Sequence, residues 1–305
     1  MKAMVYRRYG GPEVLEPAEL PDPKTHVDSV LVRVRAAALN PADLALQAGA
    51  LAEAVETYFP VVPGWDVAGV VERAGPAAGE FAPGDEVIGY LRGEVQRAHG
   101  GLAELVSADV RSLVRKPSTM SFAEAAGLPL AGLTAYQAVV HALDIQPGEL
   151  LLVHGAAGGV GSLAVQIARV RGARVIGTAS ARDHDYLRSL GVEPVTYGPG
   201  ATERIRHLPV DAVLDTAGNG ALSATPTHPG VRVASIAEIG SPGVTAVFCR
   251  LDRVDFQAVA DLAETGTLTV RVGETFPFDR AADAQRALSK RSRSGKIVVL
   301  GPGSS

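Results

Sequence analysis

The stretch LLLVHGAAGGVG, residues 150–161, decides the fold, because an apolar run ends abruptly in a cluster of glycines. The run LLLVH at 150–154 predicts a buried strand, and VGSLAVQIARVRG at 160–172 predicts the helix that follows it. A second strand is predicted by ARVIGTAS at 173–180. The order strand, helix, strand is typical of a parallel sheet covered by helices.

The glycines of this segment lie where a dinucleotide-binding turn needs bare backbone. The first makes a tight turn, the middle ones let backbone approach a pyrophosphate, and the last packs the helix on the strand. Free N–H groups at the helix N-terminus then receive the phosphates. We expect the closest backbone at Ala157, Gly158, Gly159 and Val160. The alternative is an ordinary glycine-rich turn between a strand and a helix.

The end of the second strand indicates which dinucleotide binds. An NAD site usually carries an acid about 20 residues after the glycines, bound to the ribose 2′-hydroxyl. Here Ser180 and Arg182 stand at the strand end, and no acid precedes Asp183. A hydroxyl and a guanidinium suit a 2′-phosphate, which favours NADPH over NADH. The alternative is that Arg182 is a solvated residue at a helix start.

Around this unit the chain changes character along its length. Residues 1–115 are rich in Val, Gly and Pro, with short strand-like runs separated by turn signals, which predicts a compact β-rich domain. Ser121 and Glu124 form a capping box at a helix start. From Glu149 to about Val247 strands and helices alternate. The predicted class is therefore α/β, with a β-rich domain and a doubly wound parallel sheet.

Composition excludes several classes of protein. The 305 residues suffice for two domains, and the net charge of −4 gives no reason to expect a nucleic-acid partner. Cys249 is the only cysteine, which predicts a reducing cytoplasm and no disulfide. Residues 150–168 lack charged side chains, but their glycines interrupt any membrane-spanning helix, so we expect no membrane partner.

Several stretches together resemble one enzyme family. They are AAALNPADL (36–44), PGWDVAGVVERAG (63–75), GDEVIGY (84–90), GLTAYQA (132–138), HGAAGGVG (154–161) and DAVLDTAG (211–218). The chain resembles, over nearly its whole length, the zinc-independent medium-chain dehydrogenases/reductases of the quinone oxidoreductase (zeta-crystallin-like) family. The resemblance implies a GroES-like catalytic domain from 1–120 and 265–305, a Rossmann-type NADPH-binding domain at 121–264, and a homodimer.

The same resemblance bears on metal binding. In zinc-dependent relatives a cysteine stands at the position of Asn40 and a histidine at that of Trp65, and a loop with four cysteines holds a structural zinc. Both catalytic ligands are replaced here, and the cysteine loop is absent. We therefore expect no metal. Without that Lewis acid, the acceptor for hydride should need little activation, as a quinone or an enone does.

Family roles carry over to particular residues. Asn40 and Thr134 are the expected catalytic residues: Asn40 would bond the substrate carbonyl or the nicotinamide ribose, and Thr134 would lie near the nicotinamide. For each the alternative is local, a turn residue before Pro41 for Asn40 and a helix hydroxyl bonded to its own backbone for Thr134. The remaining expected cofactor contacts are Tyr197, Thr216, Ala217, Ile236, Phe248 and Lys296. Lys296 would help Tyr197 at the adenosine phosphate, or is simply exposed.

The chain departs from its family in the substrate region. Two tyrosines of some quinone reductases fall at about Ala45 and Leu51, and no tyrosine proton donor of enoyl thioester reductases is visible, since Tyr58 is out of register. Water would then supply the proton. The expected apolar pocket consists of Leu46, Leu51, Phe59 and Trp65.

Three functions remain in view. The favoured one is an NADPH-dependent oxidoreductase that transfers hydride to a quinone or an activated C=C bond without metal. The alternatives are an NADP-dependent alcohol dehydrogenase and a non-catalytic NADPH-binding protein with a structural or regulatory role.

Overall fold

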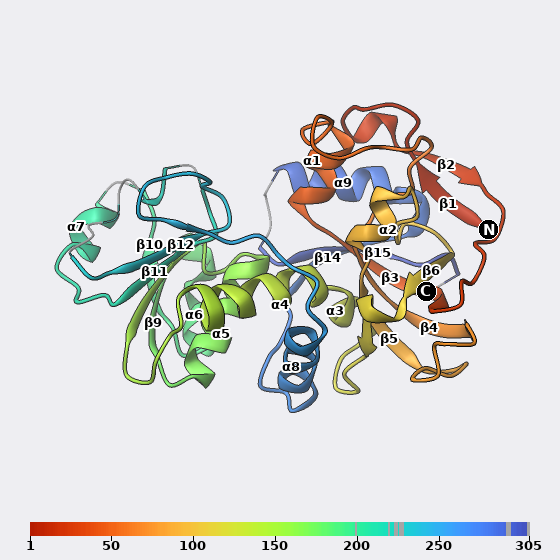
Figure 1. The fold of residues 1–305 in the computed structure, drawn as a ribbon. Helices are drawn as coiled ribbons and strands as arrows, with labels where there is room; N and C mark the ends of the chain where they lie inside the picture. Colours follow the sequence, from red (N-terminus) through yellow and green to blue (C-terminus); the bar gives the residue numbers. More distant parts are fainter. Residues whose placement is uncertain (199, 219, 223–224, 226–228, 291–293, 304–305) are drawn as a thin grey trace. The chain divides into compact units, whose positions relative to one another are not determined.

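The computed structural model describes the chain except residues 199, 219, 223–224, 226–228, 291–293 and 304–305, and it divides into two compact units (Figure 1). Unit 1 consists of Met1–Leu130, Phe256–Glu264 and Val270–Ser305. Unit 2 consists of Ala131–Asp255 and Thr265–Thr269.

Unit 1 is built on an antiparallel sheet. Its strands run in the order β14-β15-β3-β4-β5-β7, with β6 also paired to β3, and β1 pairs with β2 alongside. The bounds are β1 (Lys2–Val5), β2 (Glu16–Glu19), β3 (Ser29–Leu39), β4 (Asp66–Ala74), β5 (Glu86–Tyr90), β6 (Leu105–Asp109), β7 (Leu113–Arg115), β14 (Val272–Phe276) and β15 (Lys296–Leu300). Strand β3 is buried along most of its length because it has partners on both edges. The only parallel pair of this path is β14 with β15 among the described strands.

Helices complete unit 1 and lead out of it. They are α1 (Pro41–Gln47), α2 (Arg92–Gln96), α3 (Phe122–Ala126) and α9 (Ala281–Lys290), while α4 (Pro129–Tyr136) and α8 (Arg253–Glu264) each continue into unit 2. The predicted capping box is present, since Ser121 Oγ accepts the Glu124 N–H and the Glu124 carboxylate accepts the Ser121 N–H. Helix α3 packs against β3 and β4, so residues 121–130 group with unit 1 rather than with unit 2.

Unit 2 is built on a parallel sheet. Its strands run in the order β10-β9-β8-β11-β12-β13 (Figure 1). The bounds are β8 (Leu150–His154), β9 (Arg174–Ala179), β10 (Glu193–Thr196), β11 (Ala212–Asp215), β12 (Arg232–Ser235) and β13 (Thr245–Ala246). The helices are α5 (Gly159–Val170), α6 (His184–Ser189) and α7 (Ala201–Ile205), with a π-helical turn η3 (Gln137–Ala142). The predicted strand, turn and helix of 150–168 are thus confirmed, as is the α/β class with a β-rich unit and a doubly wound sheet.

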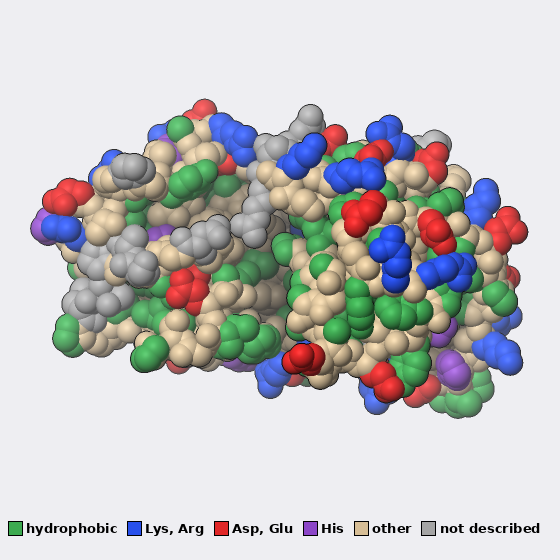
Figure 2. Space-filling view, turned by 90° about the horizontal axis from the view of Figure 1, so that it is seen from above, with side chains coloured by type: hydrophobic (Ala, Val, Ile, Leu, Met, Phe, Trp, Pro, Cys, Tyr) green, Lys and Arg blue, Asp and Glu red, His purple; other side chains and the backbone are tan. Residues whose placement is uncertain are grey.

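No helix in the described part of the chain is long and apolar enough to cross a bilayer. On the face shown in Figure 2, basic and acidic side chains are interspersed rather than gathered into a patch of one sign.

Candidate functional site

The carboxyl edge of the parallel sheet in unit 2 gathers the predicted cofactor residues. Every strand pair of this sheet is parallel, so the residues that follow the strands meet at one edge. Gly155 follows β8, Ser180 follows β9, Tyr197 follows β10, Thr216 follows β11 and Ile236 follows β12. The chain winds outward from β8 in one direction and from β11 in the other. The topological switch point therefore lies between β8 and β11, where doubly wound sheets bind their ligands.

The turn between β8 and α5 requires glycine at two positions. Gly155 has φ +71°, a conformation that side chains rarely adopt. A Cβ at Gly161 would lie 2.3 Å from the Gly155 carbonyl oxygen, so this glycine lets the turn close on the first turn of α5. Helix α5 begins directly after this turn, with Gly158 as its N-cap. The first N–H groups of a helix have no hydrogen-bond partner inside that helix.

Gly158 is different, because its surroundings leave room on the solvent side. It is exposed, and a Cβ there would meet only the Gly155 carbonyl oxygen, at 3.1 Å, which is a milder contact than the one at Gly161. Ala157 is buried, whereas Gly159 and Val160 are half-buried. An exposed glycine at the start of α5 fits a cofactor pyrophosphate. The pyrophosphate would accept hydrogen bonds from the first N–H groups of the helix, and a side chain at Gly158 would stand between the two.

The turn after β11 is organised by a buried acid that the sequence reading did not single out. Asp215 Oδ1 accepts the N–H groups of Ala217 and Gly218 at 2.9 and 3.0 Å, and its Oδ2 accepts the Ser235 hydroxyl at 2.9 Å. Thr216 Oγ1 donates to the His154 carbonyl oxygen at 2.7 Å. Thr216 and Ala217 are therefore held in place beside the glycine turn, as a cofactor site requires.

The end of β9 contains an acid next to the predicted phosphate-binding residues. The Ser180 hydroxyl donates to Asp183 Oδ2 at 2.8 Å, and Arg182 Nε lies 3.7 Å from the same oxygen. The Asp183 side chain is buried, whereas that of Arg182 is 60% exposed. Asp183 thus orients both residues, while its charge opposes a phosphate nearby. Sequence position alone did not indicate this proximity, which arises because η4 (Ala181–Asp183) folds back toward Ser180.

The other predicted contacts of unit 2 differ in accessibility. Tyr197 and Phe248 are each 61% exposed, and Ile236 is half-buried. Thr134 lies within α4 and is buried.

In unit 1, Asn40 is the centre of a buried polar cluster. It caps α1 at the end of β3, and its Nδ2 donates to Asp66 Oδ2 at 2.9 Å. Its Oδ1 accepts from Lys296 Nζ at 2.6 Å, and that ammonium lies 3.5 Å from Asp66 Oδ2. Lys296 is 6% exposed, so the alternative of a simply exposed lysine is wrong. The cluster fixes the Asn40 amide in one orientation and makes Lys296 its neighbour.

Two buried acids complete this cluster. Asp43 accepts the N–H groups of Asn40 and Trp65 at 2.7 and 3.1 Å, and burial raises the pKa of Asp43 to about 7. Burial also raises the pKa of Asp66, although the Lys296 ammonium and the Asn40 amide oppose that shift. Asp66 Oδ1 further accepts the N–H of Leu130 in the first turn of α4, at 2.9 Å. The sequence signal for both acids is their position in NPADL and GWDVAG, where the neighbouring residues are apolar or typical of turns.

The residues expected to form an apolar pocket divide into buried and exposed members. Leu46 and Trp65 are buried, whereas Leu51 and Phe59 are 37% and 42% exposed. Phe59 packs edge-on against Tyr6 and Tyr9, with ring centroids 6.0 and 5.2 Å away. Trp65 packs against Tyr90, and the Arg92 guanidinium lies 6.0 Å from its ring.

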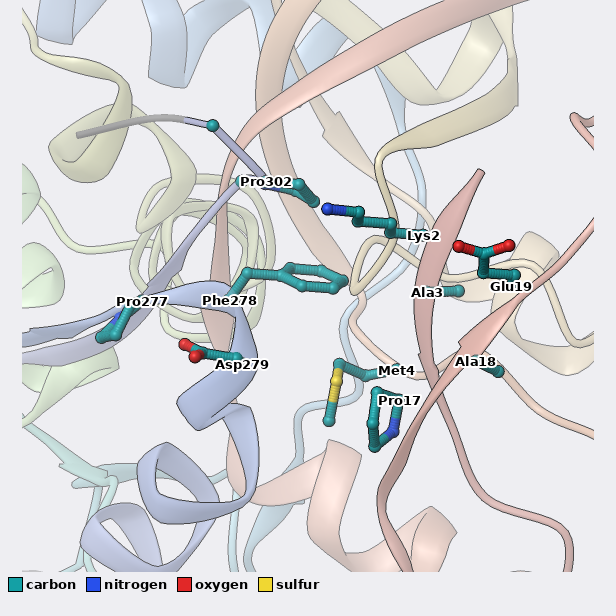
Figure 3. A pocket seen from close by; sticks show the side chains of 12 residues that line it. Lys2, Ala3, Met4, Pro17, Ala18, Glu19, Pro277, Phe278, Asp279 and Pro302 are labelled. Atoms are coloured by element: carbon teal, nitrogen blue, oxygen red, sulfur yellow. The ribbon is translucent and has the colours of Figure 1, made fainter.

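A separate cavity of about 560 Å³ opens in unit 1, and none of the predicted site residues lines it (Figure 3). Its walls come from β1, β2, the turn at 277–279 and the segment 301–303. The surrounding side chains include Lys2, Met4, Glu19 and Phe278. This cavity is therefore not the site indicated by the sequence.

The residues at the former zinc-ligand positions do not fit a zinc ion. Asn40 already bonds an ammonium and a carboxylate, and Trp65 provides no ligand atom. The Lys296 ammonium puts a positive charge where a cation would have to sit. Within the described residues, no three histidine, cysteine, aspartate or glutamate side chains come together as metal ligands.

Comparison with known proteins relates the whole chain to one group of oxidoreductases. Residues 26–118 match the family described as "Alcohol dehydrogenase GroES-like domain", and residues 190–299 match "Zinc-binding dehydrogenase". The chain is 36% identical over 311 residues to the NADPH-dependent alkenal/one oxidoreductase of Arabidopsis thaliana chloroplasts, covering 98% of this chain and 79% of that relative. It is 29% identical over 331 residues to the quinone oxidoreductase of Homo sapiens, covering 98% of both. A solved NAD-dependent alcohol dehydrogenase has a TM-score of 0.87 and 34% identity, over 98% of this chain and 99% of that one.

Proposed function

The chain belongs to the medium-chain dehydrogenase/reductase family, and we propose that it is an NADPH-dependent reductase of quinones or enones that uses no metal. The observation that carries the proposal is the polar cluster of Asn40, Asp66 and Lys296 at the former ligand position. A site without a Lewis acid suits acceptors whose reduction needs little polarisation. The similarity to an alkenal/one oxidoreductase and to a quinone oxidoreductase supports the same substrate class.

Bound NADPH would supply the hydride, and the chain's own residues would hold the reactants. The turn at Ala157–Val160 would bind the pyrophosphate, with Thr216, Ala217, Ile236, Tyr197 and Phe248 around the rest of the cofactor. Thr134 would lie at the nicotinamide. Asn40 retains one Nδ2 hydrogen after its bond to Asp66, and we assign this hydrogen to a substrate carbonyl. Lys296 is assigned to orienting Asn40 rather than to the adenosine phosphate, because its ammonium bonds the Asn40 amide.

In enone reduction the β-carbon would receive the hydride and the α-carbon a proton from water, while NADPH becomes NADP⁺. In quinone reduction hydride and proton together give the hydroquinone. Leu46, Leu51, Phe59 and Trp65 would supply the apolar surroundings that such acceptors need.

Steady-state oxidation of NADPH with a panel of quinones and enones tests this function. We expect turnover that a chelator leaves unchanged, by a protein whose elemental analysis gives well under one zinc per chain. A stoichiometric zinc that survives dialysis against chelator would overturn the metal-free mechanism. Binding of NADPH without turnover of any acceptor would favour a structural or regulatory role.

One observation supports a second candidate, an alcohol dehydrogenase. A solved NAD-dependent alcohol dehydrogenase shares 34% of its residues with this chain, and the buried Asp183 at the end of β9 is an acid of the kind that NAD sites use. Reduction of NAD⁺ or NADP⁺ by a panel of alcohols distinguishes this candidate, because the favoured function predicts none.

We also propose a homodimer in a reducing compartment such as the cytoplasm. Cys249 is the single cysteine of the sequence, which suits that compartment. The support for a dimer is β13, the last strand in the sheet order of unit 2, because an edge strand invites pairing with another chain.

A further inference from the structure

His154, the last residue of β8, lies directly beneath the glycine turn. It is 6% exposed, and both of its ring nitrogens meet threonine hydroxyls. Nδ1 lies 3.2 Å from Thr178 Oγ1 on the neighbouring strand β9, and Nε2 bonds Thr225 Oγ1 from the segment after β11. The register of the sheet pairs His154 with Thr178 and with Asp215, so the three side chains share one face.

The partner of Thr225 fixes the direction of one of these bonds. Thr225 Oγ1 donates its proton to the Ala221 carbonyl oxygen at 3.0 Å, so it accepts from His154 Nε2–H. The neutral ring with its proton on Nε2 has a bare Nδ1, which accepts the Thr178 proton. Thr178 Oγ1 in turn accepts the Gly155 N–H at 3.2 Å, so this tautomer satisfies both ring nitrogens.

This chain of bonds connects the segments on the two sides of the switch point. One end holds the N–H of Gly155, the residue whose left-handed conformation starts the glycine turn. The other end holds Thr225, which comes after Thr216 and Ala217 in the chain. The His154 carbonyl oxygen, in addition, accepts from Thr216 Oγ1.

We propose that neutral His154 is a positioning residue for cofactor binding, which holds the glycine turn and the segment after β11 in register without touching the cofactor. The proposal rests on the proposed dinucleotide site at the carboxyl edge of the parallel sheet, but not on which acceptor is reduced. Removal of His154 leaves the Gly155 turn and the Thr225 segment free to move apart, so the cofactor must order them when it binds.

The surroundings of the ring favour its neutral form. Burial lowers the pKa of His154, while Asp215 on β11 opposes that shift. Asp215 is the charged group that faces the ring; the facing residues on β9 and on the segment after β11 are the two threonines.

The test measures the dissociation constant of NADPH by fluorescence titration, beside a thermal melt, for His154→Leu, His154→Gln and Thr225→Val. We expect His154→Leu to weaken binding about tenfold, since it removes two buried hydrogen bonds. Thr225→Val removes the acceptor of Nε2 while keeping the histidine, and should weaken binding in the same direction. His154→Gln retains a donor that reaches Thr225 and should recover part of the loss. The matched control is Leu152→Ala in the same strand, which should lower the melting temperature and leave the dissociation constant unchanged.

Rescue by the conservative variant separates positioning from a structural role. His154→Gln should bind NADPH more tightly than His154→Leu, because its amide can donate to Thr225 in place of Nε2–H. The Leu152→Ala control, in contrast, should change the melting temperature alone. Folded His154→Leu and Thr225→Val that bind NADPH like wild type would overturn the proposal. So would equal affinities of His154→Gln and a folded His154→Leu, and Thr225→Val alone tests the proposal if the leucine variant does not fold.

Discussion

At the scale of single residues, Arg182 is the predicted determinant of cofactor choice. Its side chain is 60% exposed at the end of β9, where a guanidinium can form a forked pair with a 2′-phosphate. Arg182→Ala should cost NADPH binding roughly 1.5–3 kcal/mol and leave NADH nearly unchanged, because only NADPH has that phosphate. Dissociation constants for the two cofactors measure this difference.

The matched control for this prediction is Arg188→Ala, whose side chain is 58% exposed on α6 and pairs with Asp185. It should leave both dissociation constants as they are. Equal affinity of the wild type for NADPH and NADH would contradict the prediction and favour Asp183 as the ribose-binding acid.

Asp43 gives a second residue-level prediction, in the pH dependence of stability. Burial raises its pKa to about 7, whereas the unfolded carboxyl titrates near about 3.9. The folded chain therefore binds this proton more tightly, so the contribution is present at acid pH and is lost as pH rises through about 7. Asp43→Asn does not titrate, and its free energy of unfolding should fall less than that of wild type between about pH 4.5 and pH 8.

Urea unfolding at several pH values measures that slope. The control, Asp185→Asn, removes the same charge from a side chain that is 98% exposed, and it should keep the wild-type slope. Parallel slopes for Asp43→Asn and the wild type would mean that Asp43 is ionised in the folded chain at acid pH.

The sequence could indicate the role of a single residue only where that residue belongs to a local motif. Asn40 and Lys296 were both named, but their hydrogen bond joins positions 256 apart. It arises because β15 pairs antiparallel with β3, and the register Ile297 with Leu39 brings Lys296 opposite Asn40. A register between distant strands cannot be read from one sequence, so the bond between Lys296 and Asn40 could not be predicted.

At the scale of elements, the glycines of the turn before α5 have separate tasks. A Cβ at Gly161 would lie 2.3 Å from backbone oxygen and 2.9 Å from the Ala156 Cα. Gly161→Val should therefore destabilise the chain by about 1–3 kcal/mol or more, because the turn and the helix start cannot both keep their positions. Gly158→Val should abolish NADPH binding and leave the fold mostly intact, since its side chain would enter the phosphate space.

Fluorescence titration with NADPH and a thermal melt for each variant measure these two effects. Gly93→Ala in α2 is the control, because its Cβ meets open space among the described residues, and it should change neither quantity. Wild-type binding by Gly158→Val would mean that the pyrophosphate lies elsewhere. A Gly158→Val chain that does not fold would make this glycine structural.

The strand, turn and helix at 150–170 could be predicted because apolar runs and glycines specify them locally. The division of the chain could not be predicted to the residue. Helix α3 has its own capping box and reads as the start of the next domain, yet its packing partners are β3 and β4. Residues 265–269 belong to unit 2 because Gln166 on α5 bonds the Thr269 backbone through both its amide nitrogen and its oxygen. Such contacts join distant segments, and composition does not reveal them.

At the scale of the whole molecule, the parallel sheet of unit 2 ends at β13, and the segments before and after β13 in the chain carry exposed apolar side chains. These are Ile239, Leu251 and Val254, which are exposed by 66%, 46% and 80%. Burying each of them in an interface would gain about 1.5–3 kcal/mol, and an uncovered edge strand invites pairing with another chain. A second copy of the chain presents the same surface, which suits a twofold interface.

Ile239→Asp together with Val254→Asp should therefore convert a dimer into monomers, because each charge would be buried without a partner. Sedimentation equilibrium measures the mass, and a thermal melt checks that the variant is folded. Val170→Asp is the matched control, since Val170 is 51% exposed in the same unit at the end of α5, and it should leave the dimer intact. A monomeric wild type would contradict the interface. A double variant that stays dimeric would locate the interface on another surface of the chain.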